Sequence, residues 1–265
     1  SNKKGVGSRF YDKSALYHVH GEYKFEPKFT DYIVIGANGR YYRPESDGTI
    51  FYDTAGTTIS NYEYGVYSGI QKKFYSGKLI TNAAVRLDKN QNFDYIVTPA
   101  ASIVYSPAEN NYLRASFSSA IRNPTLTDQY LYLNVGRAIL GGNLKGVDSL
   151  VTVQSFIDYL NEQKYSVLQF FSINAVKPER VKTFELGYRT TLFKKLYVDA
   201  GYYYSIYDDF LGYKIGISAK WALTDPLARP KNVQVFRYAA NSDNQAAVMN
   251  QAQDSLGSVL PSPLL

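Results

Sequence analysis

The stretch RTTLFKKLYVDAGYYYSIYDDFLGY, Arg189–Tyr213, carries the pattern that decides the fold. From Leu196 to Ile206, alternate positions are apolar or tyrosine, and the positions between them are small, polar or tyrosine. A repeat of two residues is the period of a β-strand, in which successive side chains point to opposite faces. One such strand fits two architectures, because a soluble sheet buries its apolar face in a core and a membrane barrel turns it to lipid.

The same alternation recurs along the chain and predicts an all-β protein. The predicted strands are residues 14–25, 32–41, 61–74, 79–88, 93–105, 113–121, 184–192 and 196–206. They run for about 10 to 13 residues, close to what a tilted membrane-spanning strand needs. Charged side chains fall almost wholly on one face, which is otherwise rich in Ser, Thr, Asn, Gly and Tyr. A polar face of that composition is typical of the lumen of a barrel.

Tyrosine is the second signal for a membrane barrel. The chain has 26 Tyr against 14 Phe and one Trp. Many of these tyrosines lie near the ends of predicted strands, as Tyr23, Tyr41, Tyr62, Tyr95 and Tyr105 do. An amphipathic ring is stable where apolar chains meet polar headgroups, so this distribution predicts a lipid interface.

The connections between strands alternate in length. Short connections are predicted at residues 27–30, 75–78, 106–111 and 193–195, and longer ones at 44–60, 122–178 and after Asp208. Short periplasmic turns and long extracellular loops alternate in this way around a membrane barrel. The tight turn at 89–92 is an exception, which we interpret as a hairpin projecting beyond the bilayer. We therefore expect a long extracellular loop at 122–178, containing a helix near 152–163 whose shared face of Phe156, Tyr159 and Leu160 packs on the base of the loop. After Asp208 we expect an irregular stretch, then a ninth strand at 231–240 and an irregular tail at 241–265.

Composition excludes several other classes of protein. The net charge is +6, but Lys and Arg are scattered, so we predict no nucleic-acid partner. There is no Cys, which excludes disulfides and thiolate metal sites. The longest apolar runs are far shorter than a membrane helix. The first residues lack an apolar signal region, and we expect that the beginning of the natural protein is missing.

We find no pattern that predicts an enzyme, a cofactor or a metal site. Asp208 and Asp209 are adjacent on a strand and point to opposite faces, so they cannot flank one substrate. His18 and His20 share one face, but a metal site needs at least a third ligand. We interpret these two histidines as polar filling of the lumen.

Three segments resemble TonB-dependent outer-membrane receptors. They are SSAIRNPTLTDQYLYLNVG at Ser118–Gly136, VKPERVKTFELGYRTTLF at Val176–Phe193, and RLDKNQNFDYIVTPAASIVYSP at Arg86–Pro107. The last is typical of the large Bacteroidetes-type members. The resemblance implies an antiparallel transmembrane β-barrel of about 22 strands, of which residues 1–265 supply roughly eight or nine. The plug domain and energy-coupling segment that precede the barrel in this family are not recognisable here.

The resemblance also implies candidate ligand contacts at the loop 122–130 and at the tip 210–214. The residues are Arg122, Asn123, Asp128, Gln129, Tyr130, Phe210, Tyr213 and Lys214. For Arg122, anchoring to a lumenal acid is favoured over contact with an anionic ligand, since a guanidinium suits both partners.

The expected function is active transport across the bacterial outer membrane, with capture and import of a scarce, bulky nutrient. The expected partners are the lipid bilayer, a TonB-type energy-coupling protein acting through the plug, a surface lipoprotein, and a small-molecule, peptide or glycan substrate. Two alternatives stay open. One is a small eight-stranded anchor or adhesin barrel; the other is a soluble carbohydrate-binding β-sandwich, whose core would contain Tyr17, Tyr64 and Tyr202.

Overall fold

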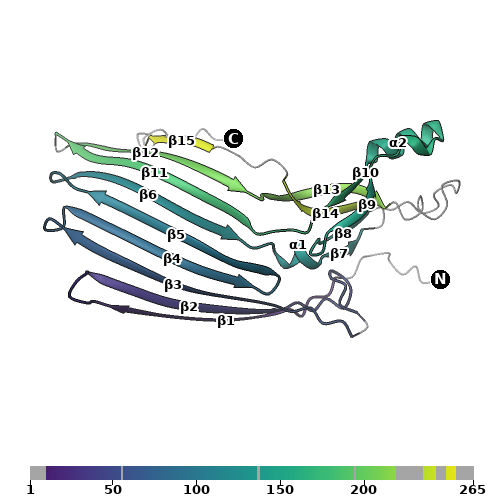
Figure 1. Cartoon of the computed structure of the whole chain (residues 1–265), viewed down its shortest axis with the longest axis horizontal. Helices are drawn as coiled ribbons and strands as arrows, with labels where there is room; N and C mark the ends of the chain where they lie inside the picture. Colours follow the sequence, from purple (N-terminus) through teal and green to yellow (C-terminus); the bar gives the residue numbers. More distant parts are fainter. Residues whose placement is uncertain are drawn as a thin grey trace, which may run out of the picture.

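A computed structural model describes residues 10–54, 56–135, 138–193, 195–218, 235–242 and 249–254, which form two β-sheets lying end to end (Figure 1). The larger one, here the barrel sheet, has nine strands in the order β1-β2-β3-β4-β5-β6-β11-β12-β15. Its strands are β1 Ala15–Phe25, β2 Tyr32–Arg43, β3 Asn61–Phe74, β4 Leu79–Asn90, β5 Phe93–Tyr105, β6 Asn111–Arg122, β11 Glu179–Leu192, β12 Leu196–Asp208 and β15 Met249–Asp254. The first eight in this order correspond to the predicted strands, but β11 begins at Glu179, five residues before its predicted start.

Strand register joins the apolar positions into one continuous face. One row across the barrel sheet contains Phe25, Ile33, Ile70, Ala83, Ala101, Phe117, Phe184 and Tyr204. The next row, on the opposite face, contains Tyr32, Gln71, Asn82, Ser102, Ser116, Glu185 and Tyr203. Because a shift by one residue would exchange the two faces, this register fixes one apolar and one polar surface.

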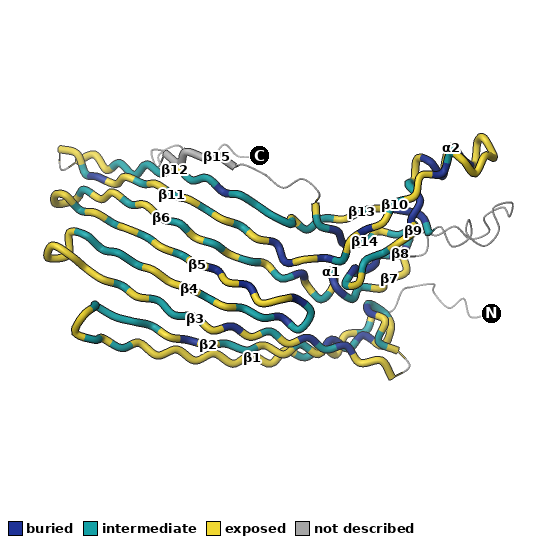
Figure 2. The backbone as a smooth tube through the Cα atoms, in the orientation of Figure 1, coloured by how far each residue is buried: buried dark blue, intermediate teal, exposed yellow. Residues whose placement is uncertain are grey.

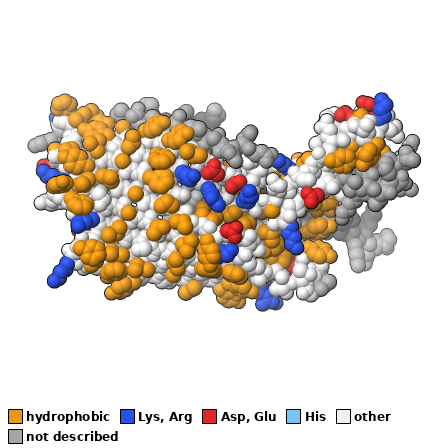
Figure 3. Space-filling model, in the orientation of Figure 1, with side chains coloured by type: hydrophobic (Ala, Val, Ile, Leu, Met, Phe, Trp, Pro, Cys, Tyr) orange, Lys and Arg blue, Asp and Glu red, His pale blue; other side chains and the backbone are white. Residues whose placement is uncertain are grey.

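No described part of the chain covers the apolar face. Val19, Tyr23 and Leu186 are 71%, 70% and 60% exposed, and exposed positions alternate along the strands of the barrel sheet (Figure 2). Figure 3 shows hydrophobic side chains spread over this sheet. A soluble sandwich would bury such a surface. The sandwich alternative is therefore wrong, since Tyr17 and Tyr64, expected in its core, are 64% and 42% exposed.

Aromatic residues border the apolar face at both ends. Tyr64 and Tyr95 meet edge to face, with centroids 6.4 Å apart, near the end that adjoins the second sheet. Tyr105 and Tyr188 lie near the end with the short turns. The ten residue-to-residue steps from Tyr95 to Tyr105 span about 33 Å along the strand, or roughly 25 Å after a tilt of about 40°. That height matches the apolar band of an outer-membrane barrel.

The barrel sheet does not close on itself. Among the described strands, β1 pairs with β2 alone, and β15 pairs with β12 alone. A complete eight-stranded barrel has no such edges. The small-barrel alternative is therefore wrong for this arrangement, and the sheet has the form of a segment of a larger barrel.

The second sheet, here the loop sheet, is built from the long connections. It has six strands in the order β10-β9-β13-β14-β8-β7. They are β7 Tyr132–Asn134, β8 Ala138–Gly141, β9 Val147–Val151, β10 Phe170–Ile173, β13 Leu211–Ser218 and β14 Val235–Asn241. The helices are α1 Leu126–Tyr130, α2 Val153–Glu162 and the 3₁₀ turn η1 Tyr165–Val167.

Three expectations are corrected by the loop sheet and β15. The stretch after Asp208 is not irregular, because β13 begins at Leu211 and pairs with β14. The ninth strand predicted at 231–240 begins at Val235 among the described residues and belongs to the loop sheet. The tail 241–265 is not wholly irregular, since β15 pairs with β12; residues 243–248 and 255–265 lie outside the described part.

The hydrophobic core lies mostly in and beneath the loop sheet. One cluster joins Val151, Phe156, Tyr159, Leu168 and Ile217, and a second joins Leu150, Ile173 and Ala240. Phe156 and Tyr159 bring α2 onto the sheet, as predicted, and the Thr152 side chain accepts from the Ser155 N–H to cap the helix. Leu160, expected on the same buried face, is 47% exposed. Within the described residues, no helix is long and apolar enough to cross a membrane.

Candidate functional site

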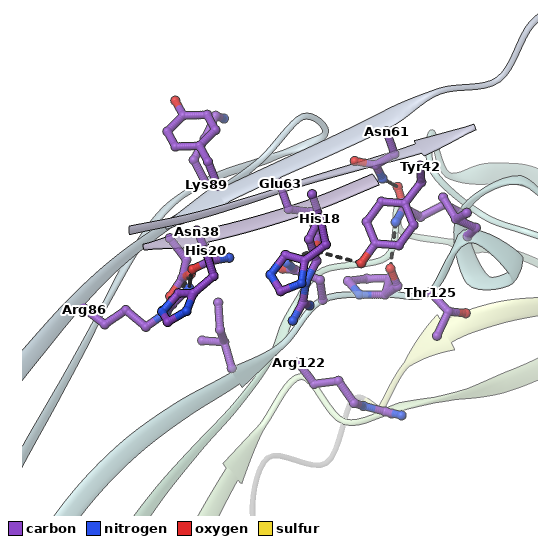
Figure 4. Close-up of a pocket in the computed structure, with 18 of the residues that line it drawn as sticks. His18, His20, Asn38, Tyr42, Asn61, Glu63, Arg86, Lys89, Arg122 and Thr125 are labelled. Carbon is purple, nitrogen blue, oxygen red and sulfur yellow. Dashed lines mark hydrogen bonds and ion pairs between the residues drawn. The ribbon is translucent and has the colours of Figure 1, made fainter. Parts of the chain in front are cut away.

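The polar face of the barrel sheet forms a cavity of about 870 Å³ where it approaches the loop sheet. Its wall comes from β1 to β4, and its rim from the end of β6 and from α1 (Figure 4). The charged side chains that face it are Arg40, Arg86 and Arg122 and two acids, Glu63 and Asp88, with His18 and His20 beside them. Lys89 also borders the cavity but points to the outer face, where its Nζ lies 5.3 Å from the Tyr95 ring centroid (Figure 4). Three guanidinium groups and two carboxylates therefore face the cavity.

Arg86 is fixed flat against the wall. Its Nε donates to both carboxylate oxygens of Asp88, at 2.8 and 2.7 Å, and its Nη2 donates to Asn38 Oδ1 at 2.6 Å. The guanidinium also lies 5.6 Å from the ring centroid of Tyr67. Gly65 makes this position possible, since a Cβ there would lie 2.3 Å from Arg86 Nη2. Arg86 is thus held in place with one edge toward the cavity.

A second set of contacts extends down the same wall. The Tyr67 hydroxyl donates to Glu22 Oε2, and its oxygen lies 2.9 Å from His20 Nε2. Because the Tyr67 hydroxyl donates its hydrogen bond to Glu22, its oxygen accepts from His20, whose Nε2 must carry the proton. Gly36 leaves space for the ring, because a Cβ there would meet Tyr67 Cζ at 2.2 Å. His20 is therefore part of a hydrogen-bonded network, which agrees with its interpretation as lumen filling.

Glu63 ties the wall to the rim. Its Oε1 accepts from Asn90 Nδ2 and from Asn123 Nδ2, both at 2.9 Å, and its Oε2 accepts from the Tyr42 hydroxyl at 3.2 Å. Asn123, a predicted site residue, lines the cavity and is anchored by this carboxylate.

Arg122 anchors the start of the long loop. Arg122, at the end of β6, is paired in the sheet with Glu179, at the start of β11, and its Nε donates to Glu179 Oε2. Glu179 Oε1 also accepts from the Leu211 N–H, so one carboxylate joins both sheets. This ion pair agrees with the anchoring role favoured from the sequence, while the side chain of Arg122 stays 58% exposed toward the cavity.

The other predicted residues of the 122–130 segment support the rim. Asp128 completes a capping box with Thr125, whose N–H donates to Asp128 Oδ2 at 2.8 Å. Gln129 is buried; its Oε1 accepts from Asn92 Nδ2 at 2.7 Å, and its Nε2 donates to Pro124 O at 2.7 Å. The Tyr130 hydroxyl accepts from Asn92 Nδ2 at 2.6 Å. These contacts position α1 over the cavity.

The structure does not bring the 210–214 group to this cavity. Phe210 and Tyr213 are 53% and 55% exposed at the start of the loop sheet, and Lys214 lies on β13. Arg237 stacks 3.8 Å from the Tyr213 ring centroid. Of the predicted residues, Arg122, Asn123 and Gln129 line the cavity; the others do not. Among the described residues no group of His, Cys, Asp and Glu has the geometry of a metal site.

The wall residues Arg40, Arg86 and Tyr42 were missed as candidates in the sequence. A signal was present, because Gly36 and Gly65 occupy polar-face positions opposite Glu22 and Asp88. Glycine at such a position indicates a close approach by another group. Which long side chain fills the space depends on strand register, which is a property of the folded sheet.

Comparisons with known proteins agree with this geometry. A sequence profile of the family described as TonB dependent receptor-like, beta-barrel, matches residues 3–219. No curated protein matches the chain. The structure is similar to the siderophore receptor PirA from Pseudomonas aeruginosa, with a TM-score of 0.58 at 14% identity over 91% of this chain and 39% of PirA.

Two further solved structures share the fold. A mutant of the ferric enterobactin receptor PfeA from Pseudomonas aeruginosa gives a TM-score of 0.61 at 13% identity, over 90% of this chain and 32% of PfeA. The hemophore receptor HasR from Serratia marcescens, solved with its hemophore HasA and heme, gives 0.56 at 10% identity, over 90% of this chain and 38% of HasR. The chain thus spans well under half of each. The match of the family profile to most of its length shows that the chain belongs to the TonB-dependent receptor β-barrel family.

Proposed function

We propose that this chain forms part of the barrel wall of an outer-membrane receptor that captures a scarce, bulky nutrient and imports it with energy delivered through TonB. The observation that carries the proposal is the separation of the two faces of the barrel sheet. An exposed apolar face about 25 Å high suits lipid, and a polar face that ends in a cavity lined by three arginines suits a water-filled lumen.

The charge of the cavity supports an anionic substrate. Arg40 is exposed, and Arg86 and Arg122 are held at fixed positions by Asp88 and Glu179. Guanidinium groups fixed in this way bind carboxylate, catecholate or phosphate oxygens without losing further conformational freedom. The solved structures named above are receptors for siderophores or for a hemophore. We propose an anionic iron chelate as the substrate class.

The test is growth on defined iron sources. A strain lacking the gene is grown under iron limitation with purified ferric siderophores or heme supplied one at a time. The proposal expects loss of growth on at least one anionic chelate, restored by the wild-type gene and reduced when Arg40 is replaced by Ala. Arg43→Ala, which changes an arginine outside the cavity, is the matched control.

Equal growth of the deletion strain on every iron source would refute the substrate class. Recovery of the intact protein in the soluble fraction would refute membrane transport as a whole. A surface lipoprotein partner, also expected from the resemblance, is tested by co-purification from detergent extracts.

A further inference from the structure

The apolar face of the barrel sheet is not flat near its short-turn end. A groove of about 580 Å³ opens there, and almost all of its lining is apolar. Its floor is Ala115 and Ala200, together with the backbone of residues 114, 187 and 201. Its walls are Ile103, Tyr105, Leu113, Leu186, Tyr188 and Tyr202.

Strand register creates the groove by placing small residues between large ones. Ala115 is paired on one side with Ile103 and on the other with Leu186. Ala200 is paired with Tyr188 on one side. The two alanines lie on β6 and β12, on either side of β11, and their short side chains next to Ile103, Leu186 and Tyr188 leave the depression.

The polar neighbours of the groove point away from it. Arg114 lies on the opposite face, with its Nε 3.2 Å from Glu185 Oε1 and its Nη2 3.6 Å from Asp199 Oδ1. Gly187 accommodates that side chain, because a Cβ there would lie 2.2 Å from Arg114 Nε. Among the side chains that the structure describes, the groove therefore presents hydrocarbon and tyrosine rings to the outside and no charged group.

Two lysines lie in the short turns at this end of the barrel sheet, at the level of a lipid headgroup. The Lys78 carbonyl accepts from the Ser106 N–H at 2.7 Å, which places Lys78 beside the residue that follows Tyr105. Lys195 lies in the turn between β11 and β12, immediately before β12. Against these two cations, the turn 106–110 contributes one acid, Glu109. The local charge thus complements a phosphate group at the edge of the apolar band.

We propose that this groove binds one acyl chain of a phospholipid from the leaflet on the short-turn side, with Lys78 and the Tyr105 hydroxyl at its headgroup. The occupant is a phospholipid because the groove is continuous with the apolar face and because short turns of these barrels face the periplasm. The site rests on the membrane orientation proposed above. Selectivity over other lipids comes from packing against the groove, since hydrophobic transfer is equal for every chain in a bilayer.

The test uses the intact receptor in detergent, titrated with palmitoyl-oleoyl phosphatidylethanolamine and measured by native mass spectrometry. Ala115→Phe fills the floor of the groove with a ring. Ala83→Phe makes the same change on the same face outside the groove, where Ala83 pairs with Ile70 and Ala101. Ala115→Leu is a second, smaller filling variant, in case the ring prevents folding.

We expect the tightest lipid-binding step to weaken by about tenfold in Ala115→Phe or Ala115→Leu and by less than about twofold in Ala83→Phe. Equal retention in all three proteins would overturn the groove while leaving transport intact. If the Ala115 variants lost dimers and kept their lipid, the groove would be a contact for a second copy of the chain, and the lipid proposal would be overturned. Absence of any lipid from the wild-type protein would refute the membrane orientation itself.

Discussion

The two faces of β5 predict that arginine at adjacent positions has very different effects on the free energy of unfolding. Ala101 lies in the central row of the apolar face, and Ala100 lies beside it on the polar face, paired with Ala84 and Ser118. Ala101 is four residues from Tyr105 and six from Tyr95, so it lies about 10 Å inside the apolar band. Both are alanines on one strand at nearly one depth, which makes them matched sites.

Arginine near the middle of a lipid-facing surface destabilises an outer-membrane barrel by about 2–4 kcal/mol, because the guanidinium must leave water. We therefore expect Ala101→Arg to lower the free energy of unfolding by about that amount. Ala100→Arg faces the lumen, and we expect a change within about 1 kcal/mol.

The assay is reversible urea or guanidinium unfolding of the intact receptor from phospholipid vesicles, followed by the mobility of unheated samples in gels. Equal free-energy changes for the two variants would refute the assignment of faces. A larger loss for Ala100→Arg would show that the faces are reversed.

Three further predictions test the wall, the rim and the outer loop. Gly65→Ala places a Cβ against Arg86 and is expected to lower the free energy of unfolding by roughly 1–3 kcal/mol. The control Gly21→Ala adds a Cβ that meets nothing within 4 Å and is expected to change it little. Both are measured by chemical denaturation, and equal losses would contradict the close approach of Arg86 to Gly65. Glu179→Gln weakens the contacts to Arg122 and Leu211 and is expected to lower the free energy of unfolding by about 1 kcal/mol, because Arg122 is half exposed. We also expect faster amide exchange in residues 122–130, and unchanged exchange there would argue against the anchoring role. Burial opposes ionisation of Asp53, but hydrogen bonds from the Ser46 and Gly48 N–H groups outweigh it and lower the pKa of this carboxyl, so its contribution to the 44–60 loop is present above the ordinary carboxyl pKa and is lost as the pH falls through the lowered value. Exchange of the Gly48 amide should then rise in strong acid in the wild type and be high at every pH in Asp53→Asn, and a pH-independent wild type would contradict it.

The long loop shows how a connection of this family becomes a folded unit. Asn143 is buried; its Nδ2 donates to Asn174 O at 2.7 Å and to Ala239 O at 3.0 Å, and its N–H donates to Asp128 O at 2.8 Å. One side chain thus joins the 122–178 loop to β14, far along the chain. The GGN segment at 141–143 therefore links the end of β8 to α1 and to β14.

The sequence by itself determined the barrel sheet. Alternation with a period of two is a local property, and each of the eight predicted strands shows it. Residues such as Leu186 and Tyr202 therefore indicate where a strand lies and which of its faces is apolar, without knowledge of the neighbouring strands. The family motifs lie in the same strands. This is why the apolar face and the family could both be predicted.

Only the tertiary structure decided the loop sheet, the ninth strand of the barrel sheet and the cavity. A strand at 231–240 was predicted, but its membership of the loop sheet was not, because β13 and β14 pair with β9 and β8, which lie far away in sequence. The hydrogen bonds that fix Gln129 in the rim also depend on tertiary structure, because its partner Asn92 comes from the β4–β5 turn. Ligand contact by Asp128 and Gln129 stays a prediction. Register between strands, set by the packing of the whole sheet, places Arg86 against Gly65 and builds the site.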